Sequence, residues 1–219
     1  MLSRIALGAV VALLSTSAMA ADLIIDEPAA VIPASAFDWS GLYVGAHAGW
    51  ATGSVLADPI DAPDETTAVG WLLGVQAGAN AQFDSFVLGV EGDVAWTNIT
   101  NEDEIFAVGG PFGLTDVNWL ASLRGRAGVA FDQVLLYATA GVAAAGVTYN
   151  DLDGDDPASD GTHFGWVAGV GVELAVTEDV SVKAEYLYHD FGAVTYYDEF
   201  PDDVSFNLHT IKAGVNFHF

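Results

Sequence analysis

The 219-residue sequence contains no cysteine and very few basic residues. Without cysteine, the chain is neither a small disulfide-stabilised scaffold nor a lipoprotein acylated on a cysteine at its first mature residue. Only 5 lysine and arginine residues stand against 30 aspartate and glutamate residues, so the formal net charge is −25. Nucleic acid is excluded as a partner, because binding it requires a basic surface that neutralises phosphates.

Long apolar runs are also missing, although 52% of the residues are hydrophobic and the mean hydropathy is +0.38. Beyond the N-terminal segment, no stretch offers the roughly 18 consecutive apolar residues that indicate a transmembrane helix. The nearest run, 134–147, is interrupted by Thr139 and two glycines. Hydrophobicity divided among many short segments is typical of a transmembrane β-barrel.

Residues 1–20 have the order of features of a secretory signal peptide. Arg4 is followed by an apolar run over 5–14, and small residues precede Ala21. That run is too short to span a bilayer. The segment 21–38 has two prolines and no periodicity, which predicts a periplasmic linker ahead of a barrel over 39–219.

Eight segments alternate apolar and polar residues with the period of a β-strand. They span 39–52, 69–83, 86–98, 116–131, 134–149, 162–176, 180–191 and 205–219. Three connections are tight, at 84–85, 132–133 and 177–179, and four are long, at 53–68, 99–115, 150–161 and 192–204. Short and long connections alternate strictly. This pattern predicts an all-β, eight-stranded antiparallel transmembrane barrel with short periplasmic turns, four longer extracellular loops and both termini in the periplasm.

Large aromatic residues mark both ends of the predicted strands. Tryptophans gather at the long-loop end and phenylalanines at the short-turn end: Trp50, Trp71, Trp96, Trp119 and Trp166, against Phe83, Phe86, Phe131, Phe217 and Phe219. The two aromatic residues of one strand lie on the same face. At a strand tilt of about 40°, they are about 25 to 30 Å apart along the membrane normal. This spacing matches an apolar band between two aromatic girdles.

The opposite face of the predicted strands carries charged residues. These are Glu91, Asp93, Arg124, Arg126, Glu173, Lys183, Glu185 and Lys212. Each would cost on the order of 3 kcal/mol in lipid, whereas in a lumen acids and bases pair with one another. The interior of an eight-stranded barrel is just wide enough for side chains to fill. We therefore expect these residues to form an ion-pair network in a plugged lumen, without a wide channel.

Acidic residues concentrate in and beside the four long connections, most densely at Asp151, Asp153, Asp155, Asp156 and Asp160. An acidic outer mouth would repel an anionic lipopolysaccharide layer unless Ca²⁺ or Mg²⁺ bridges the two. Outer-membrane lipid and lipopolysaccharide are therefore expected partners. The aspartates do not match a calcium loop, because their glycine comes before the third aspartate and not after it, and no glutamate occupies the twelfth position.

Other site chemistry is not predicted. The five histidines lack ligand spacing such as HExxH, so we expect no dedicated metal site and no cofactor. Ser205 and His209 fall near one rim with Asp190, but no nucleophile motif such as GxSxG marks them. The chain is therefore not expected to be an enzyme, and no catalytic residue is predicted.

Several blocks of the sequence recur in one known group of proteins. They are Trp39-Ser-Gly-Leu-Tyr-Val-Gly, Gly89-Val-Glu-Gly-Asp93, Leu123-Arg-Gly-Arg-Ala-Gly128, Leu136-Tyr-Ala-Thr-Ala-Gly-Val-Ala143, Lys183-Ala-Glu-Tyr-Leu-Tyr-His-Asp-Phe-Gly192 and His209-Thr-Ile-Lys-Ala-Gly-Val-Asn-Phe-His-Phe219. Together they resemble the small outer-membrane β-barrels of alphaproteobacteria, which are porin-like or immunogenic proteins similar to opacity-type and outer-membrane protein A-type barrels. The resemblance implies an outer-membrane location, antigenic surface loops, and insertion by the barrel-assembly machinery through Phe217 and Phe219.

These observations predict a structural envelope protein that presents acidic surface loops. Two alternatives stay open: a narrow porin for small cationic solutes, and an adhesin or haem-binding surface protein. A neutral interior favours a plug, whereas an acidic mouth would favour cations if the lumen opened. The sequence leaves open the loop ligand and the oligomeric state.

Overall fold

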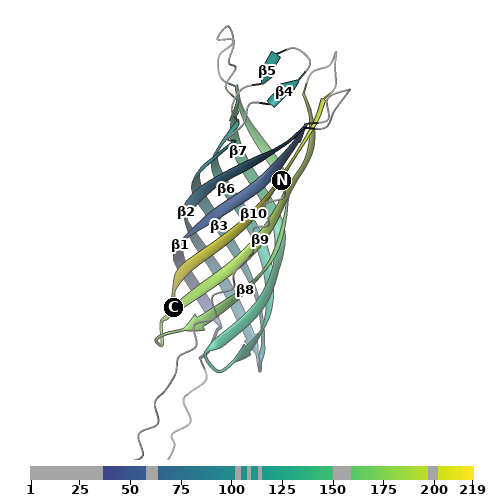
Figure 1. The fold of residues 1–219 in the computed structure, drawn as a ribbon. Helices are drawn as coiled ribbons and strands as arrows, with labels where there is room; N and C mark the ends of the chain where they lie inside the picture. Colours follow the sequence, from purple (N-terminus) through teal and green to yellow (C-terminus); the bar gives the residue numbers. More distant parts are fainter. Residues whose placement is uncertain are drawn as a thin grey trace, which may run out of the picture. The chain divides into compact units, whose positions relative to one another are not determined.

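The computed structural model describes residues 37–57, 64–101, 105–107, 110–112, 115–149, 159–196 and 202–219. Eight long strands form one closed antiparallel barrel in the order β1-β10-β9-β8-β7-β6-β3-β2, which confirms the predicted fold, and β4 and β5 form a separate two-stranded sheet. The strands are β1 Gly41–Ala57, β2 Asp64–Phe83, β3 Phe86–Asn101, β4 Ile105–Ala107, β5 Gly110–Phe112, β6 Thr115–Phe131, β7 Val134–Tyr149, β8 Ser159–Ala175, β9 Val180–Tyr196 and β10 Asp202–His218. Figure 1 shows the tilted strands closing into a ring, with the C-terminus at the end of the barrel opposite β4 and β5. The described residues include no helix long and apolar enough to cross a membrane.

The strands run further than the apolar alternation indicates, so the predicted bounds of the four long connections are wrong. β1 and β2 pair as far as Ala57 and Asp64, which leaves only 58–63 between them. The predicted loop 99–115 contains the β4–β5 pair. The alternation of apolar and polar residues ends before the strands do. Strand ends that project beyond the apolar band meet water on both faces, so neither face needs apolar residues there. Their backbone groups still form hydrogen bonds with the neighbouring strand.

The three tight turns lie where they were predicted. Asp84 and Asp132 begin the two-residue turns with φ of 54° and 53°, a left-handed conformation that aspartate tolerates better than most residues. In the third turn the Thr177 hydroxyl accepts hydrogen bonds from the backbone N–H groups of Asp179 and Val180, at 3.3 and 3.0 Å. Each of the three tight turns joins two strands that lie side by side in the barrel: β2 and β3, β6 and β7, and β8 and β9.

Side chains divide between the two faces of the sheet as the alternation predicts. Tryptophans of the long-loop end face outward, and Trp50 lies opposite Trp71 on the neighbouring strand. Trp119 lies opposite Trp96 but is half-buried, where the register of β6 shifts beside Val117. The phenylalanines of the turn end are exposed on the outer surface.

Buried side chains fill the lumen in three layers. At the long-connection end lies an apolar layer of Ala51, Ala68, Leu72, Ala95, Ile99, Val117, Leu120, Ala143, Ala145, Val147, Val167, Leu187, Phe191 and Leu208. At the turn end lies a floor of Trp39, Val87, Leu135, Tyr137 and Ala175, with Phe37 and Ala130 packed against it. Along each strand, the buried charged residues fall between these two apolar clusters.

Residues that precede β1 contribute to the floor. The predicted first strand 39–52 begins instead at Gly41, and Trp39 lies fully buried at the turn end. The Trp39 ring packs edge-on against Phe37, with centroids 4.7 Å apart, and its backbone N–H donates to Gln82 Oε1 at 2.9 Å. The Ser40 N–H donates to Asp38 Oδ1 at 2.9 Å, which holds the pKa of that carboxyl below its usual range.

Two glycines make room for the tyrosines of the lumen. Gly78 lies opposite Tyr43, and Gly171 lies opposite Tyr137. A Cβ atom at either glycine would collide with the tyrosine ring. Glycine therefore allows each ring to lie close against the neighbouring strand.

We predict that Gly171→Ala lowers the free energy of unfolding by about 1–3 kcal/mol, because it overpacks a filled interior. The measurement is the urea unfolding midpoint of the barrel in detergent micelles. Gly92→Ala is the matched control, since a Cβ there meets no atom nearer than 3.8 Å. Equal midpoints for the two variants would contradict the packing argument.

Candidate functional site: the lumen ion-pair network

The eight predicted charged residues lie together in the middle of the lumen, and we call them the lumen network. They come from five strands: Glu91 and Asp93 from β3, Arg124 and Arg126 from β6, Glu173 from β8, Lys183 and Glu185 from β9, and Lys212 from β10. Their side chains are at most 7% exposed. Burial at this level requires that the charges neutralise one another.

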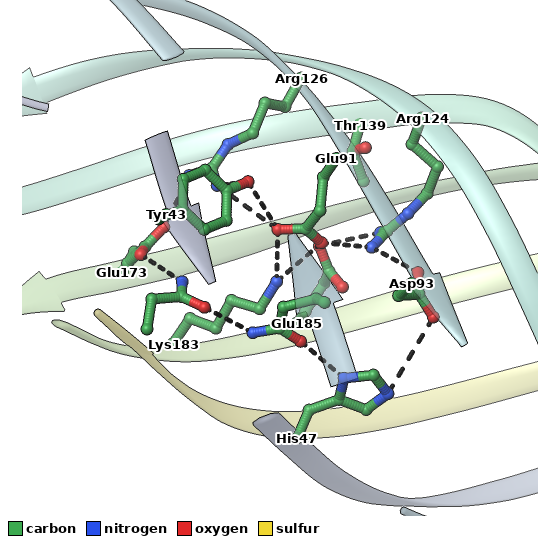
Figure 2. Close-up of polar contacts among 12 residues, drawn as sticks. Tyr43, His47, Glu91, Asp93, Arg124, Arg126, Thr139, Glu173, Lys183 and Glu185 are labelled. Carbon is green, nitrogen blue, oxygen red and sulfur yellow. Dashed lines mark hydrogen bonds and ion pairs between the residues drawn. The ribbon is translucent and has the colours of Figure 1, made fainter. Parts of the chain in front are cut away.

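Glu91 is the centre of the lumen network, as Figure 2 shows. Arg124 Nη2 lies 2.6 Å from Glu91 Oε1, and Lys183 Nζ lies 2.8 Å from both carboxylate oxygens. The Tyr43 hydroxyl donates to Oε2 at 2.8 Å, and Arg126 Nη1 approaches the same oxygen at 3.7 Å. One carboxylate therefore holds three cations in place.

The contact between Glu91 and Lys183 crosses the lumen. β3 and β9 stand opposite each other in the ring of eight strands, four places apart in either direction. In the sheet ladder Lys183 lies opposite Glu173 on the adjacent strand, yet its amine reaches Glu91 on the far wall. Opposite walls of the barrel are thus joined by a charge-assisted hydrogen bond.

A second group of contacts lies on the long-connection side of Glu91. Arg124 Nη2 is 3.1 Å from Asp93 Oδ1, and its Nη1 is 3.0 Å from Glu185 Oε1. The Ser122 hydroxyl donates to Asp93 at 2.5 Å. Lys212 Nζ lies between the two acids, 3.4 Å from Asp93 and 3.5 Å from Glu185. Each acid of this group therefore has two cationic neighbours.

Arg126 anchors the turn side of the lumen network. Its Nη2 lies 2.6 Å from Glu173 Oε2, and its Nη1 donates to the Tyr43 hydroxyl at 2.9 Å. The guanidinium carbon is 4.2 Å from the ring centroid of Tyr137 and 5.5 Å from that of Tyr43. Two aromatic faces and the carboxylates of Glu173 and Glu91 surround this buried cation, a combination that favours arginine over lysine.

Uncharged polar residues extend the lumen network, and the sequence analysis did not predict their role. The ring of His47 is hydrogen-bonded to Gln76 at 2.6 Å, and Gln76 Nε2 donates to Asn216 at 2.6 Å. Asn216 Nδ2 then donates to Glu173 Oε1 at 2.7 Å, and the Ser181 hydroxyl donates to the same oxygen. The alternation places all of these residues inward, so strand parity was the signal that would have identified them.

The sequence analysis also did not predict that Tyr43 and Tyr137 belong to the lumen network. Aromatic residues were assigned to membrane girdles, yet both tyrosines lie on the inward face and bond to charged groups. The Tyr137 hydroxyl donates to Glu185 Oε1 at 3.1 Å. A buried tyrosine combines a large apolar ring with a polar tip, which suits a boundary between an apolar floor and a charged layer.

Phe217 and Phe219 face outward at the turn end. Their rings meet edge to face with centroids 5.2 Å apart. The Phe219 N–H donates to the Leu42 carbonyl at 2.9 Å, which extends the pairing of β10 with β1. Their predicted role as an assembly signal stays a prediction.

No group of three or more His, Asp and Glu side chains in the described part of the chain is placed to hold a metal ion. The acidic segment with Asp151, Asp153, Asp155 and Asp156 lies outside the described residues, and nothing tests its predicted cation binding. The described contacts of the lumen network suit charge neutralisation and mechanical closure of the lumen.

We predict that Glu91→Gln lowers the free energy of unfolding by about 3–5 kcal/mol, because it leaves buried cations without their shared partner. Urea unfolding midpoints in detergent micelles measure this. The matched control is Glu178→Gln in the exposed third turn, expected to change stability by less than about 0.5 kcal/mol. If both substitutions shift the midpoint equally, Glu91 does not hold the lumen together.

Comparison with known proteins agrees with this geometry. Residues 8–219 match the family model of the outer membrane protein beta-barrel domain. The chain is 34% identical, over 244 aligned positions covering all of both chains, to the 31 kDa outer-membrane immunogenic protein of Brucella melitensis biotype 1. It is 30% identical to the 25 kDa outer-membrane immunogenic protein of Brucella abortus biovar 1, over 94% of this chain and 92% of that relative.

Among solved structures, Neisserial surface protein A is similar over 82% of this chain and 98% of its own, with 22% identity and a TM-score of 0.48. The family that the sequence blocks suggested is confirmed by the family model and the relatives. The chain belongs to the outer membrane protein beta-barrel domain family, as an outer-membrane barrel of the immunogenic-protein type with membrane-spanning strands.

Proposed function

We propose that this protein is a structural barrel of the outer membrane whose lumen is closed to solutes and whose acidic loops face the outside. The observation that carries the proposal is the hydrogen-bonded contact of Glu91 with Lys183 across the full width of the lumen. Such a contact leaves no central passage at the level of the lumen network. It also ties opposite walls of the barrel together, which suits an envelope component under mechanical load.

The apolar layer supports closure independently of the lumen network. Leu72, Leu187 and Leu208 are among its buried members, each at most 2% exposed. Porin lumens are lined by polar groups and filled with water, because an ion needs substitutes for its hydration shell. An ion that passed the charged layer would next meet mainly apolar side chains, with His189 and Thr210 as buried polar exceptions.

The remaining assignments of the proposal rest on sequence and family membership. Residues 1–20 act as a cleaved signal peptide, 21–38 as a periplasmic linker, and both termini lie in the periplasm. Phe217 and Phe219 contact the barrel-assembly machinery during insertion. The acidic loops meet lipopolysaccharide through bridging divalent cations.

We predict that the chain from Ala21, refolded in detergent and shown to be folded by its heat-dependent gel shift, gives no single-channel steps in planar bilayers. A double variant, Glu91→Gln with Lys183→Met, is expected to stay silent as well, because the apolar layer still closes the lumen. A porin with a known open channel, tested in the same bilayers, controls for detection. Stable cation-selective steps from the wild-type barrel would establish the narrow-porin alternative in place of this proposal.

A further inference from the structure

One seam of the barrel ends before its two strands do. β8 and β9 pair only as far as Trp166 and Asp190, and no further pair joins them in the described residues. Beyond that point β8 continues to Ser159 and stays paired with β7, while β9 continues to Tyr196 and stays paired with β10. Each of the two strands therefore has one open edge at the long-connection end of the barrel.

A bulge in β9 lies at the point where the two strands part. Asp190 pairs with Asn207 of β10 and Ala193 pairs with Ser205, so three steps along β9 correspond to two along β10. Gly192, within the bulge, has a φ of 66°, and its N–H donates to Asp190 Oδ1 at 2.9 Å. A bulge of this kind bends its strand, and this one begins at the last residue of β9 that pairs with β8.

The open edge of β8 presents backbone hydrogen-bonding groups at every second residue. The Ala175 N–H donates to the Gln133 carbonyl on the β7 side, and the Val176 N–H donates to the Val180 carbonyl on the β9 side. In an antiparallel strand the N–H and C=O of one residue point to the same neighbour, and this side alternates along the strand. The pairing of β8 with β7 has no register shift, so the even-numbered residues point to the open side. These residues are Asp160, Thr162 and Phe164.

The open edge of β8 lies beyond the apolar band of the barrel. Trp166 belongs to the tryptophan girdle, and such girdles sit at the level of lipid headgroups. At a strand tilt of about 40° each residue adds about 2.5 Å of height, which places Phe164 and Asp160 about 5 and 15 Å past the girdle. The Phe164 side chain is 76% exposed. Under the proposed orientation, on which this step rests, the edge faces the external medium.

The chain supplies acidic charge around this edge. Apart from Arg4, all of its lysine and arginine residues belong to the lumen network. Asp160 lies on the open edge, Asp190 lies at the last pair, and Asp202 and Asp203 lie on β10 beside the continuation of β9. A second copy of this chain would bring the same acidic edge, and like charges across a strand pair are destabilising. An extended segment with lysine or arginine side chains is complementary to the edge.

We propose that the open edge of β8 over 160–164 binds an extended, basic peptide segment of an external protein, which adds to the barrel sheet as a further strand. Main-chain hydrogen bonds to Thr162 and Phe164 supply the affinity, as in other cases of strand addition to a sheet edge. An apolar side chain of the segment covers the exposed Phe164 ring, and its basic side chains meet the surrounding acids. The site lies outside the lumen, so it adds a binding role to a closed structural barrel.

Amide hydrogen exchange, followed by nuclear magnetic resonance on the chain from Ala21 refolded in detergent micelles, tests the proposal. Without a partner, Thr162 and Phe164 should exchange at least about tenfold faster than Gly161 and His163, whose N–H groups face β7. The probe is the capped heptapeptide Thr-Lys-Val-Lys-Val-Lys-Thr. It should slow exchange at Thr162 and Phe164 by at least about tenfold, whereas the same peptide with glutamate in place of lysine should not.

Two substitutions at Thr162 separate the backbone edge from the side chain. Thr162→Pro removes one N–H from the open edge and leaves the bonds between β8 and β7 in place, so the lysine peptide should no longer protect Phe164. Thr162→Val is the matched control, because it keeps the N–H, and the peptide should protect Phe164 as in the wild type. The heat-dependent gel shift shows whether both variants are folded.

Several results would overturn the proposal. Slow exchange at Thr162 and Phe164 in the free barrel would show that the chain itself covers the edge. An unchanged exchange rate on adding the lysine peptide, equal protection by the two peptides, or equal protection in the two variants would each contradict strand addition by a basic segment. A dimer that Thr162→Pro dissociates would make a second copy of the chain the occupant.

The proposed orientation has a separate test. Thr162→Cys introduces the one cysteine of the chain, and a membrane-impermeant maleimide should label it on intact cells. An absence of labelling would overturn the external partner together with the orientation, whereas the exchange rates of the refolded barrel report on the edge in either orientation. None of these outcomes alters the conductance test of a closed lumen, so strand addition and lumen closure fail separately.

Discussion

The Glu91 carboxylate, held at once by Arg124, Lys183 and the Tyr43 hydroxyl, is the contact on which the rest of the interior depends. Closing eight strands into a ring removes the sheet edges within the apolar band and leaves a lumen that side chains alone must fill. Charges inside it have little water to solvate them. They are stable only when each finds an opposite charge, and the lumen network meets that condition with four acids and four bases.

The outer surface obeys a different constraint, because it faces lipid. Large aromatic rings mark its two ends, and apolar side chains cover the band between them. Within this band the outward side chains vary in size, from Ala127 and Ala138 to Ile211, and Tyr186 forms a hydrogen bond with His209 on the outer surface.

Much of this architecture was accessible from the sequence, for stated reasons. The inward position of Arg124 and Glu91 followed from parity, since a strand has only two faces. The positions of Asp84 and Asp132 in turns followed from the break between two alternating segments. The strand ends were misjudged because water on both faces removes the apolar signal there. Tyr43 and Tyr137 were overlooked because an aromatic ring suits either a girdle or a filled lumen.

The sequence by itself determined the number of strands in the barrel, the sites of its tight turns and the face on which each charge lies, because these depend on local alternation and turn chemistry. The tertiary structure decided which charges meet. Lys183 lies opposite Glu173 in the ladder but bonds to Glu91 across the lumen, while Arg126 takes Glu173 between two tyrosine rings. Such distances depend on the register and closure of the whole barrel, which no single strand encodes.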